Sequence, residues 1–237
     1  MRIALIGYGK MGKEIEKIAL ERGHSISLKV TSENRDYKPE DLKETDVAIE
    51  FSVPGAAYSN ISKCLEAGVP VAVGTTGWYD KLEELTDYCN NNKGAILHAT
   101  NFSIGVNIFF ELNKKLAELM NPHKDYEPNI TEIHHVQKLD APSGTAITLA
   151  EGLLTNFNDK NHWVNEPSNN KTDLEIVSLR EPEVPGTHTI KYENEIDKIE
   201  ITHTAHNRKG FALGSVLAAE WLTDKNGVFT MQDMLNL

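Results

Sequence analysis

Short strand-like runs alternate with amphipathic segments along the first hundred residues of the chain. The runs expected to be strands are 3–6, 25–30, 46–54, 69–73 and 95–98, and helical spacing of apolar residues occurs at 14–20, 56–67 and 79–91. Strands and helices that alternate at this length predict a parallel sheet with right-handed crossovers.

The pattern changes after the first hundred residues. We predict a helix that runs to Met120, with Asn107 as its cap, and then a strand at 130–137. A second helix is expected to start near Thr145. The polar segment 156–170 is expected to be a loop.

The segment that follows is rich in strands and lacks helices between them. Three strand-like segments lie at 175–180, 188–192 and 198–203, and 185–188 is the expected hairpin-like connection between the first two. This part of the chain therefore indicates a second, mixed or antiparallel sheet. The fold class that we predict is α/β, with a Rossmann-like parallel-sheet domain and an α+β domain with a mixed sheet.

The amino-acid composition is typical of a globular protein. The chain has 237 residues, of which 40% are hydrophobic, enough for one large or two modest domains. No apolar run is long enough to span a bilayer, and residues 1–6 lead directly into a strand pattern, so we expect neither a membrane span nor a signal peptide. Cys64 and Cys89 lie far apart without metal-ligand spacing, which favours a reducing cytoplasm.

The formal net charge of -11 argues against nucleic acid as a partner, because neutralising phosphates requires a concentrated basic face. A protein this acidic also repels anionic ligands on average. Binding one therefore requires a local basic cluster that overrides the overall field.

A glycine motif follows the first predicted strand and leads into a helix. Residues 7–12 fit the pattern Gly-x-Gly-x-x-Gly, and this context is typical of a dinucleotide site. The first glycine permits the tight turn, the second lets backbone approach the pyrophosphate, and the third packs helix on strand. A plain strand–helix turn is the alternative. The cofactor contacts expected here are Gly7, Tyr8, Gly9, Lys10, Met11 and Gly12.

The segment Gly74-Thr75-Thr76-Gly77 ends the predicted strand at 69–73. Small residues at this place let a flat nicotinamide or its ribose lie against backbone, because open α/β sheets bind ligands at the carboxyl ends of their strands. A glycine turn with exposed hydroxyls is the alternative.

The strongest candidate chemistry lies in the middle of the chain. His134, His135 and Lys138 place two imidazoles and an ammonium before a helix start, where Ser143 or Thr145 is the expected cap. Imidazole exchanges protons near neutral pH, a positioned lysine is a strong donor, and the amides of a helix N-terminus hold a carboxylate. This stretch predicts a pocket for an acidic substrate that also receives protons.

Two pairs of histidines lie close together in the sequence. A regular strand cannot send both His134 and His135 into one pocket, because neighbouring side chains point to opposite faces. Either the strand ends or bulges there, or one imidazole is structural. His203 and His206 are spaced three apart, but no third ligand lies at useful spacing, so we expect no metal site.

Several of these strings, in this order, resemble the dihydrodipicolinate reductase family. They are residues 134–145 (His-His-x-x-Lys-x-Asp-Ala-Pro-Ser-Gly-Thr), the Gly-Thr-Thr-Gly loop, residues 101–107 (Asn-Phe-Ser-x-Gly-Val-Asn) and a closing helix at 210–222. The resemblance implies a discontinuous dinucleotide-binding domain, 1–102 and 209–237, and a substrate-binding and oligomerisation domain, 103–208. Members of this family are usually tetramers through the second sheet, which implies a homotetramer.

The resemblance also implies roles for single residues. By this resemblance His134 exchanges protons with the substrate and His135 contacts the substrate, while Lys138 is a second candidate proton donor. The amides of Gly144 and Thr145 are expected to hold the substrate carboxylates. The further cofactor contacts expected are Phe51, Gly74, Thr75, Thr76, Ala99, Thr100, Asn101 and Phe102, although Phe102 is also a plausible core aromatic.

The choice between NADH and NADPH stays open. NAD-preferring proteins place an acid near the end of the second strand, but Thr31 and Ser32 stand here and the first acid is Glu33. By resemblance Lys10 lies where a basic residue meets the extra phosphate of NADP, and a solvated surface lysine is the alternative.

The activity implied is NAD(P)H-dependent reduction of 4-hydroxy-tetrahydrodipicolinate, a cyclic dicarboxylate, to tetrahydrodipicolinate in the diaminopimelate route of lysine biosynthesis. One alternative is another nicotinamide-dependent dehydrogenase of a small amino or keto acid, which leaves residues 140–145 unexplained. A second is a regulator that senses the dinucleotide and binds no substrate, for which Lys138 would be dispensable.

Overall fold

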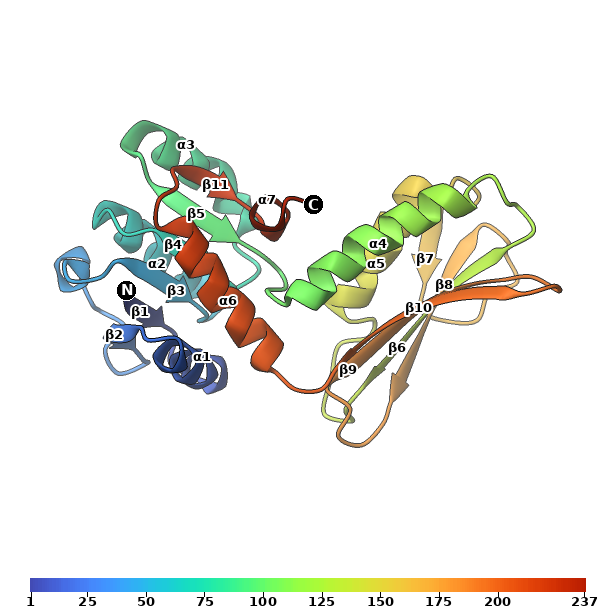
Figure 1. Ribbon diagram of the computed structural model, residues 1–237, viewed down its shortest axis with the longest axis horizontal. Helices are drawn as coiled ribbons and strands as arrows, with labels where there is room; N and C mark the ends of the chain where they lie inside the picture. The colour runs from blue at the N-terminus through green and yellow to red at the C-terminus, as the bar shows by residue number, and fades with distance from the viewer. The chain divides into compact units, whose positions relative to one another are not determined.

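The computed structural model describes all 237 residues, which form two compact units (Figure 1). The first unit comprises Met1–Ile104 and Arg208–Leu237, and the second comprises Gly105–Asn207. The chain thus leaves the first unit once and returns to it for the last thirty residues.

The first unit is built on a six-stranded sheet in the order β11, β5, β4, β3, β1, β2, in which every neighbouring pair is parallel. In that order the strands are Gly227–Phe229, Ala95–His98, Val71–Val73, Val47–Glu50, Arg2–Ile6 and Ser25–Val30. The predicted Rossmann-like parallel sheet is confirmed. The strand β11 and the short helix α7 (Met231–Leu235) after it were not predicted.

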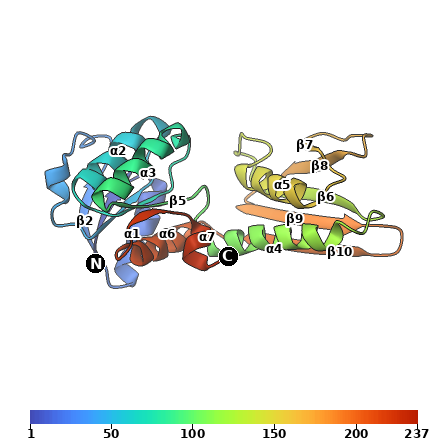
Figure 2. The same ribbon diagram turned by 90° about the horizontal axis from the view of Figure 1, so that it is seen from above.

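Helices cover both faces of this sheet. The helices α1 (Lys10–Glu21) and α6 (Lys209–Leu222) lie on one face, and α2 (Pro54–Glu66) and α3 (Leu82–Asn92) lie on the other (Figure 2). Ile3 and Leu5 of β1 pack with α1 and α6, whereas Ala4 and Ile6 pack with α2 and α3. Because successive side chains of a strand point to opposite faces, a strand buried on both faces needs an uninterrupted apolar run.

The second unit contains a five-stranded sheet in the order β10, β9, β6, β8, β7. In that order the strands are Lys198–Ala205, Gly186–Glu193, Glu127–His134, Asp173–Arg180 and His162–Val164. The strand β6 pairs parallel with β8 and antiparallel with β9, so the sheet is mixed, as predicted. The helices α4 (Ile104–Met120) and α5 (Gly144–Asn156) share one core with Ile130, Ile176 and Ile190 and so cover one face (Figure 1).

The other face of this sheet carries no helix. Val177 and Leu179 of β8 alternate with residues that face the helices, and they are 38% and 42% exposed. The hydroxyls of Thr189 and Thr202 lie 3.0 Å apart on neighbouring strands. This face therefore combines apolar side chains with hydroxyls and exposes both.

Four details of the second half differ from the predictions. The strand expected at 130–137 ends at His134. Asn107 does not cap α4, because the helix begins at Ile104 and Asn107 lies buried within it. The loop expected at 156–170 contains β7, which pairs with β8. The expected connection at 185–188 is wrong, because β9 begins at Gly186 and β6 lies between β8 and β9.

No helix of the structure has both the length and the apolar character needed to cross a membrane. Cys64 and Cys89 are buried and unpaired. Both belong to the core that α2 and α3 form with the parallel sheet.

Close packing of α6 against the rest of the first unit depends on Gly214. A Cβ atom at this position would overlap the carbonyl oxygen of Phe102. Gly210, one turn earlier in the same helix, would bring a Cβ only to ordinary contact with the Ser103 hydroxyl, 3.5 Å away. The two glycines therefore differ in whether the fold can accept a side chain.

We expect Gly214→Ala to lower the free energy of unfolding by about 1–3 kcal/mol, the usual cost of overpacking. Gly210→Ala is the matched control and should be neutral or slightly stabilising, because alanine is the better helix former. Urea unfolding followed by circular dichroism measures both. Equal stabilities of the two variants would show that the close approach of Gly214 to Phe102 does not limit packing.

Candidate active site

The glycine loop of the first unit has the geometry that its motif predicts. Gly7 has a φ of 97°, and a Cβ there would overlap the carbonyl of Phe51. A Cβ on Gly12 would overlap the carbonyl of Gly7, so this glycine lets α1 pack against the loop. A Cβ on Gly9 would meet nothing within 4 Å. Backbone at Gly9 is therefore open to a ligand at the N-terminus of α1, where amides lack helical partners.

A pocket of about 380 Å³ opens beside this loop. Seven of the predicted cofactor contacts line it, and Ser52 and Pro54, which the sequence did not single out, complete its wall. The seven are Gly9, Lys10, Met11, Phe51, Gly74, Thr75 and Thr76. Three sequence segments that follow β1, β3 and β4 thus meet at the carboxyl edge of the parallel sheet, as expected for this fold.

The wall of the pocket is held by packing and by one buried acid. The ring of Phe51 lies where a Cβ of Gly74 would be, and its centroid is 5.6 Å from that of Phe102. The Ser52 amide donates to Thr75 Oγ1 at 2.8 Å. Ser52 Oγ donates to Glu50, which is fully buried, and burial raises the pKa of Glu50. The loops after β3 and β4 are therefore tied together below the pocket.

The other predicted cofactor residues lie outside this pocket. Tyr8 donates its hydroxyl to Glu16, and the Ala99 amide donates to the Val73 carbonyl at 3.2 Å. Thr100 is exposed, and Asn101 is buried and accepts from the Ser103 amide at 2.9 Å. The remaining residue, Phe102, is buried in the core, so its alternative as a core aromatic holds.

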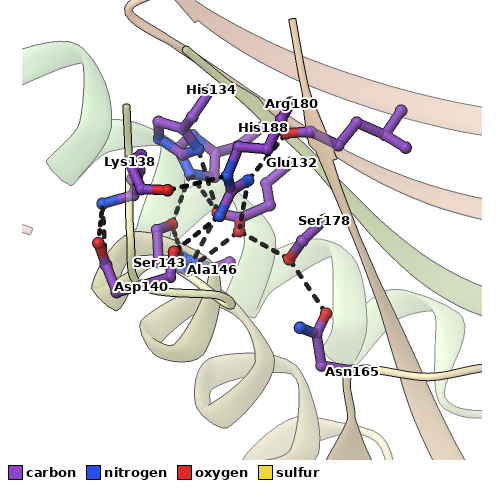
Figure 3. Close-up of polar contacts among 11 residues, drawn as sticks. Glu132, His134, Lys138, Asp140, Ser143, Ala146, Asn165, Ser178, Arg180 and His188 are labelled. Carbon is purple, nitrogen blue, oxygen red and sulfur yellow. Dashed lines mark hydrogen bonds and ion pairs between the residues drawn. The ribbon is translucent and has the colours of Figure 1, made fainter. Parts of the chain in front are cut away.

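In the second unit, strand register gathers a polar cluster on the helix-covered face. Glu132 of β6 lies opposite Ser178 of β8 and His188 of β9, and His134 lies opposite Arg180. Side chains that face each other across a sheet point to the same side, so these residues of three strands meet at one end of the sheet (Figure 3).

Glu132 is the centre of this cluster and is fully buried. The Ser143 amide donates to both of its oxygens, at 3.0 and 3.1 Å, and Ser178 Oγ donates to Oε1 at 2.7 Å. Burial alone would raise the pKa of Glu132, but His188, Ser143 and Ser178 outweigh burial and lower it to about 2. The carboxylate is thus ionised at neutral pH.

His134 lies directly beside this carboxylate. Its Nδ1 is 3.4 Å from Glu132 Oε2, out of line for a hydrogen bond, and has no other partner. Its ring has room because Gly186 lacks a Cβ, which would stand 3.0 Å from His134 Nε2. Burial lowers the pKa of His134 to about 4, against the attraction of Glu132. The imidazole is therefore neutral at pH 7.

The chain turns sharply after His134. The Lys138 amide donates to the His135 carbonyl at 3.0 Å, so the strand ends between the two histidines. His135 is half-buried, and its Nδ1 has no hydrogen-bond partner. Lys138 Nζ contacts both oxygens of Asp140, at 2.9 and 2.8 Å, and its side chain is 22% exposed. The first of the sequence alternatives, a strand that ends, is confirmed.

Arg180 and Ser143 fix the loop that carries Lys138. The Arg180 guanidinium donates to the carbonyls of Asp140 and Lys138, at 2.7 and 3.4 Å. Ser143 caps α5 by accepting from the Ala146 amide at 3.2 Å, which confirms one of the two predicted caps. Gly144 is exposed at the first position of the helix, and Thr145 follows it.

His134, Lys138 and the start of α5 were predicted from the sequence, and in the structure His134 and Ser143 lie beside Glu132 while Lys138 lies near His134. Sequence reasoning did not find Ser178, Arg180, Gly186 or His188 as members of the site, and it left Glu132 without a role. The available signal was the two-residue period of a strand, which places Glu132 and His134 on one face of β6. Pairing between distant strands leaves no such local signal.

Comparison with known proteins gives a consistent result over the whole chain. A family model described as the N-terminus of dihydrodipicolinate reductase matches residues 1–102, and one described as its C-terminus matches residues 105–235. A 4-hydroxy-tetrahydrodipicolinate reductase of Christiangramia forsetii is 50% identical over 236 residues, which cover 100% of this chain and 98% of the relative. One of Thermosipho africanus is 36% identical, with 99% and 98% covered.

A similar solved structure is the dipicolinate-bound dihydrodipicolinate reductase from a Paenisporosarcina species. Its TM-score is 0.79 at 24% identity, and the match covers 99% of each chain. An amine dehydrogenase from Mycobacterium smegmatis has a TM-score of 0.60 at 10% identity, with 96% of this chain and 94% of that chain covered. These two likenesses concern the fold alone.

We expect the His134 imidazole to titrate near pH 4, against an ordinary value of 6.5. Because the folded pKa lies below the unfolded one, this histidine lowers the free energy of unfolding as pH falls from about 6.5 toward 4. Glu132→Gln should lower the His134 pKa further, since an attracting charge is lost. NMR titration of the histidine ring signals measures both values. Titration of His134 at its ordinary pH would contradict the assignment.

Proposed function

The chain belongs to the dihydrodipicolinate reductase family, and from this and its two sites we infer that it is a 4-hydroxy-tetrahydrodipicolinate reductase. It uses NAD(P)H and a proton to reduce the cyclic dicarboxylate to tetrahydrodipicolinate, with the 4-hydroxyl lost as water, in the diaminopimelate route of lysine biosynthesis. The observation that carries this is the pairing, in one chain, of an open glycine loop on a parallel sheet with a cluster of His134, Lys138 and the start of α5.

The two units supply different parts of the reaction. When bound to the first unit, the reduced nicotinamide supplies the hydride. Hydride addition to a conjugated imine builds negative charge that must be protonated, and the second unit offers two groups that exchange protons. We propose that its cationic groups also hold the substrate, because a dicarboxylate needs fixed positive partners.

Lys138 is the better proton donor in the free protein. His134 is neutral at pH 7, because burial lowers its pKa to about 4. The Lys138 ammonium is held by Asp140 on an accessible loop. We propose that Lys138 delivers the proton, while the approach of a dianion raises the pKa of His134 and lets it exchange protons during turnover.

Substrate carboxylates are assigned to the turn and to the helix start. His135 is half-buried beside Lys138, and the Gly144 and Thr145 amides stand in the first turn of α5, at the positive end of the helix dipole. The side chain of Arg180 adds positive charge beside this loop. We propose these groups as the local basic cluster that an acidic protein needs.

The cofactor is proposed to lie on the loop of residues 7–12 and in the adjoining pocket. Gly9 lets backbone approach the pyrophosphate, and residues 74–76 with Phe51 flank the nicotinamide end. Lys10 stands at the first position of α1, and its side chain is exposed. Because no acid stands at Thr31 or Ser32 to repel a phosphate, we propose that both NADH and NADPH are accepted.

We propose that the uncovered face of the second sheet joins four copies of the chain. Val177 and Leu179 place exposed apolar side chains on this face, beside threonine hydroxyls, which is the mixture typical of an interface. Light scattering on a sizing column should give four times the 26.4 kDa mass of one chain. A monomeric mass would contradict the proposed tetramer but would not bear on the proposed activity.

The activity is tested by the absorbance of the reduced cofactor in the presence of the cyclic dicarboxylate. We expect Lys138→Met to lower turnover by about 10²–10⁴-fold, the range for loss of a general acid, with cofactor affinity nearly unchanged. The control is Lys124→Met, which removes a surface lysine that also pairs with an aspartate, Asp159, at 2.6 Å. The control should turn over like the wild type.

Each alternative function predicts another outcome of this assay. Oxidation of the reduced cofactor by a small keto acid, or reduction of the oxidised cofactor by a small amino acid, would indicate a different dehydrogenase. Cofactor binding without oxidation by any dicarboxylate would indicate a dinucleotide sensor. A Lys138→Met variant with wild-type rates would refute the donor role while leaving the overall reaction in place.

A further inference from the structure

We propose that Glu132, His134 and His188 bind a transition-metal ion of the zinc class. We also expect the ion to inhibit the enzyme. This expectation rests on the proposed function, because the ion would bind the His134 imidazole that exchanges protons. The binding itself rests only on the geometry of the second unit. It contradicts the expectation, drawn from the spacing of His203 and His206, that the chain lacks a metal site.

The three side chains form a buried and compact donor set. The exposed fractions of the Glu132, His134 and His188 side chains are 0%, 9% and 6%. One donor atom from each lies within 4.8 Å of the other two. Glu132 Oε2 is 3.4 Å from His134 Nδ1 and 3.6 Å from His188 Nε2. Surface histidines and acids often approach by chance, but three groups this deep are held by the fold.

These separations suit tetrahedral zinc. Ligand bonds of about 2.0–2.1 Å at tetrahedral angles place two donor atoms roughly 3.3 Å apart. Both distances from Glu132 Oε2 are near this value. Small side-chain rotations would bring the nitrogens of the two imidazoles to the same separation from each other. His134 Nδ1, which has no hydrogen-bond partner, faces this point from one side. An ion would therefore satisfy an atom that the protein leaves unsatisfied.

The surroundings would hold two of the ligands in place. Ser178 donates to Glu132 Oε1 and the Ser143 amide donates to both oxygens, so the carboxylate is fixed with Oε2 toward the two imidazoles. Hydrogen bonds of this kind orient metal ligands in known sites. Ser143 Oγ, 3.2 Å from His188 Nε2, stands next to the fourth position, where a water or the hydroxyl itself completes the shell.

The chemistry of the donors selects the ion. Two imidazoles and one carboxylate suit Zn²⁺, Co²⁺, Ni²⁺ and Cu²⁺, whereas Mg²⁺ and Ca²⁺ require six or more oxygen ligands. A bound ion would take up a lone pair of His134 and place positive charge beside it. The imidazole could then not cycle between its neutral and protonated forms, so an occupied enzyme would lose the part of its turnover that depends on His134.

Metal binding is tested without reference to activity. Protein freed of metal by a chelator is titrated with Co²⁺, whose four-coordinate complexes absorb visible light, and with Zn²⁺ in a calorimeter. We expect one equivalent of either ion to bind and Mg²⁺ to give no signal. His188→Gln and Glu132→Gln should each weaken Zn²⁺ binding by more than about tenfold, because each removes one donor.

The matched control is His162→Gln. His162 Nε2 lies 3.2 Å from Asp173, but its side chain is 59% exposed, so it represents a chance histidine–carboxylate pair. This variant should bind Zn²⁺ like the wild type. Circular dichroism shows whether each variant is folded, and NADPH binding reports on the first unit separately. If one donor variant fails to fold, the other carries the comparison.

Inhibition is tested next, with free Zn²⁺ fixed by a metal buffer because dicarboxylates chelate metals. Because a bound ion would block proton exchange at His134, we expect Zn²⁺ to lower kcat for cofactor oxidation and a chelator to restore it. Absence of stoichiometric Co²⁺ or Zn²⁺ binding, or unchanged affinity in a folded His188→Gln variant, would overturn the proposal. An inactive protein that still binds one Zn²⁺ would refute the proposed function and leave the metal site standing.

Discussion

A single buried carboxylate organises the second unit. Glu132 is ionised and has no exposed surface, and isolating such a charge from water costs several kcal/mol unless donors surround it. The donors come from two other elements, Ser178 from β8 and the Ser143 amide at the start of α5, and His188 of β9 lies 3.6 Å from Oε2. The need to satisfy this charge therefore fixes the strands and helix start that carry the chemistry.

The same charge influences the protonation of the neighbouring His134. His134 is buried enough to be neutral, yet it lies 3.4 Å from an anion that would stabilise its protonated form. A second negative charge, from a substrate, would act in the same direction. Arg180 adds positive charge beside this acid, with Nη1 3.8 Å from Glu132 Oε1, and Lys138 is held nearby by Asp140. This arrangement suits a group that must change protonation when an anion arrives.

Much of the first unit could be predicted from the sequence because its signals are local. An apolar run, a glycine motif and a helix follow one another at 3–21, and Gly7 and Gly12 have the turn and the close packing that the motif predicts. The second unit was harder. That β6 would lie between β8 and β9 depends on pairings across more than forty residues, so Ser178, Arg180 and His188 carried no local mark of the site. Gly186 belongs to it only because the ring of His134 needs that space.

The organising role of the Glu132 carboxylate is tested by the steady-state rate of Glu132→Gln with the cyclic dicarboxylate and NADPH. The amide keeps the shape of the side chain but cannot accept at both oxygens from Ser143 or attract His134. We predict that kcat/KM falls by about a hundredfold, the cost of misplacing catalytic groups by roughly an ångström, while the affinity for NADPH is unchanged. A folded variant with wild-type kcat/KM would contradict this role.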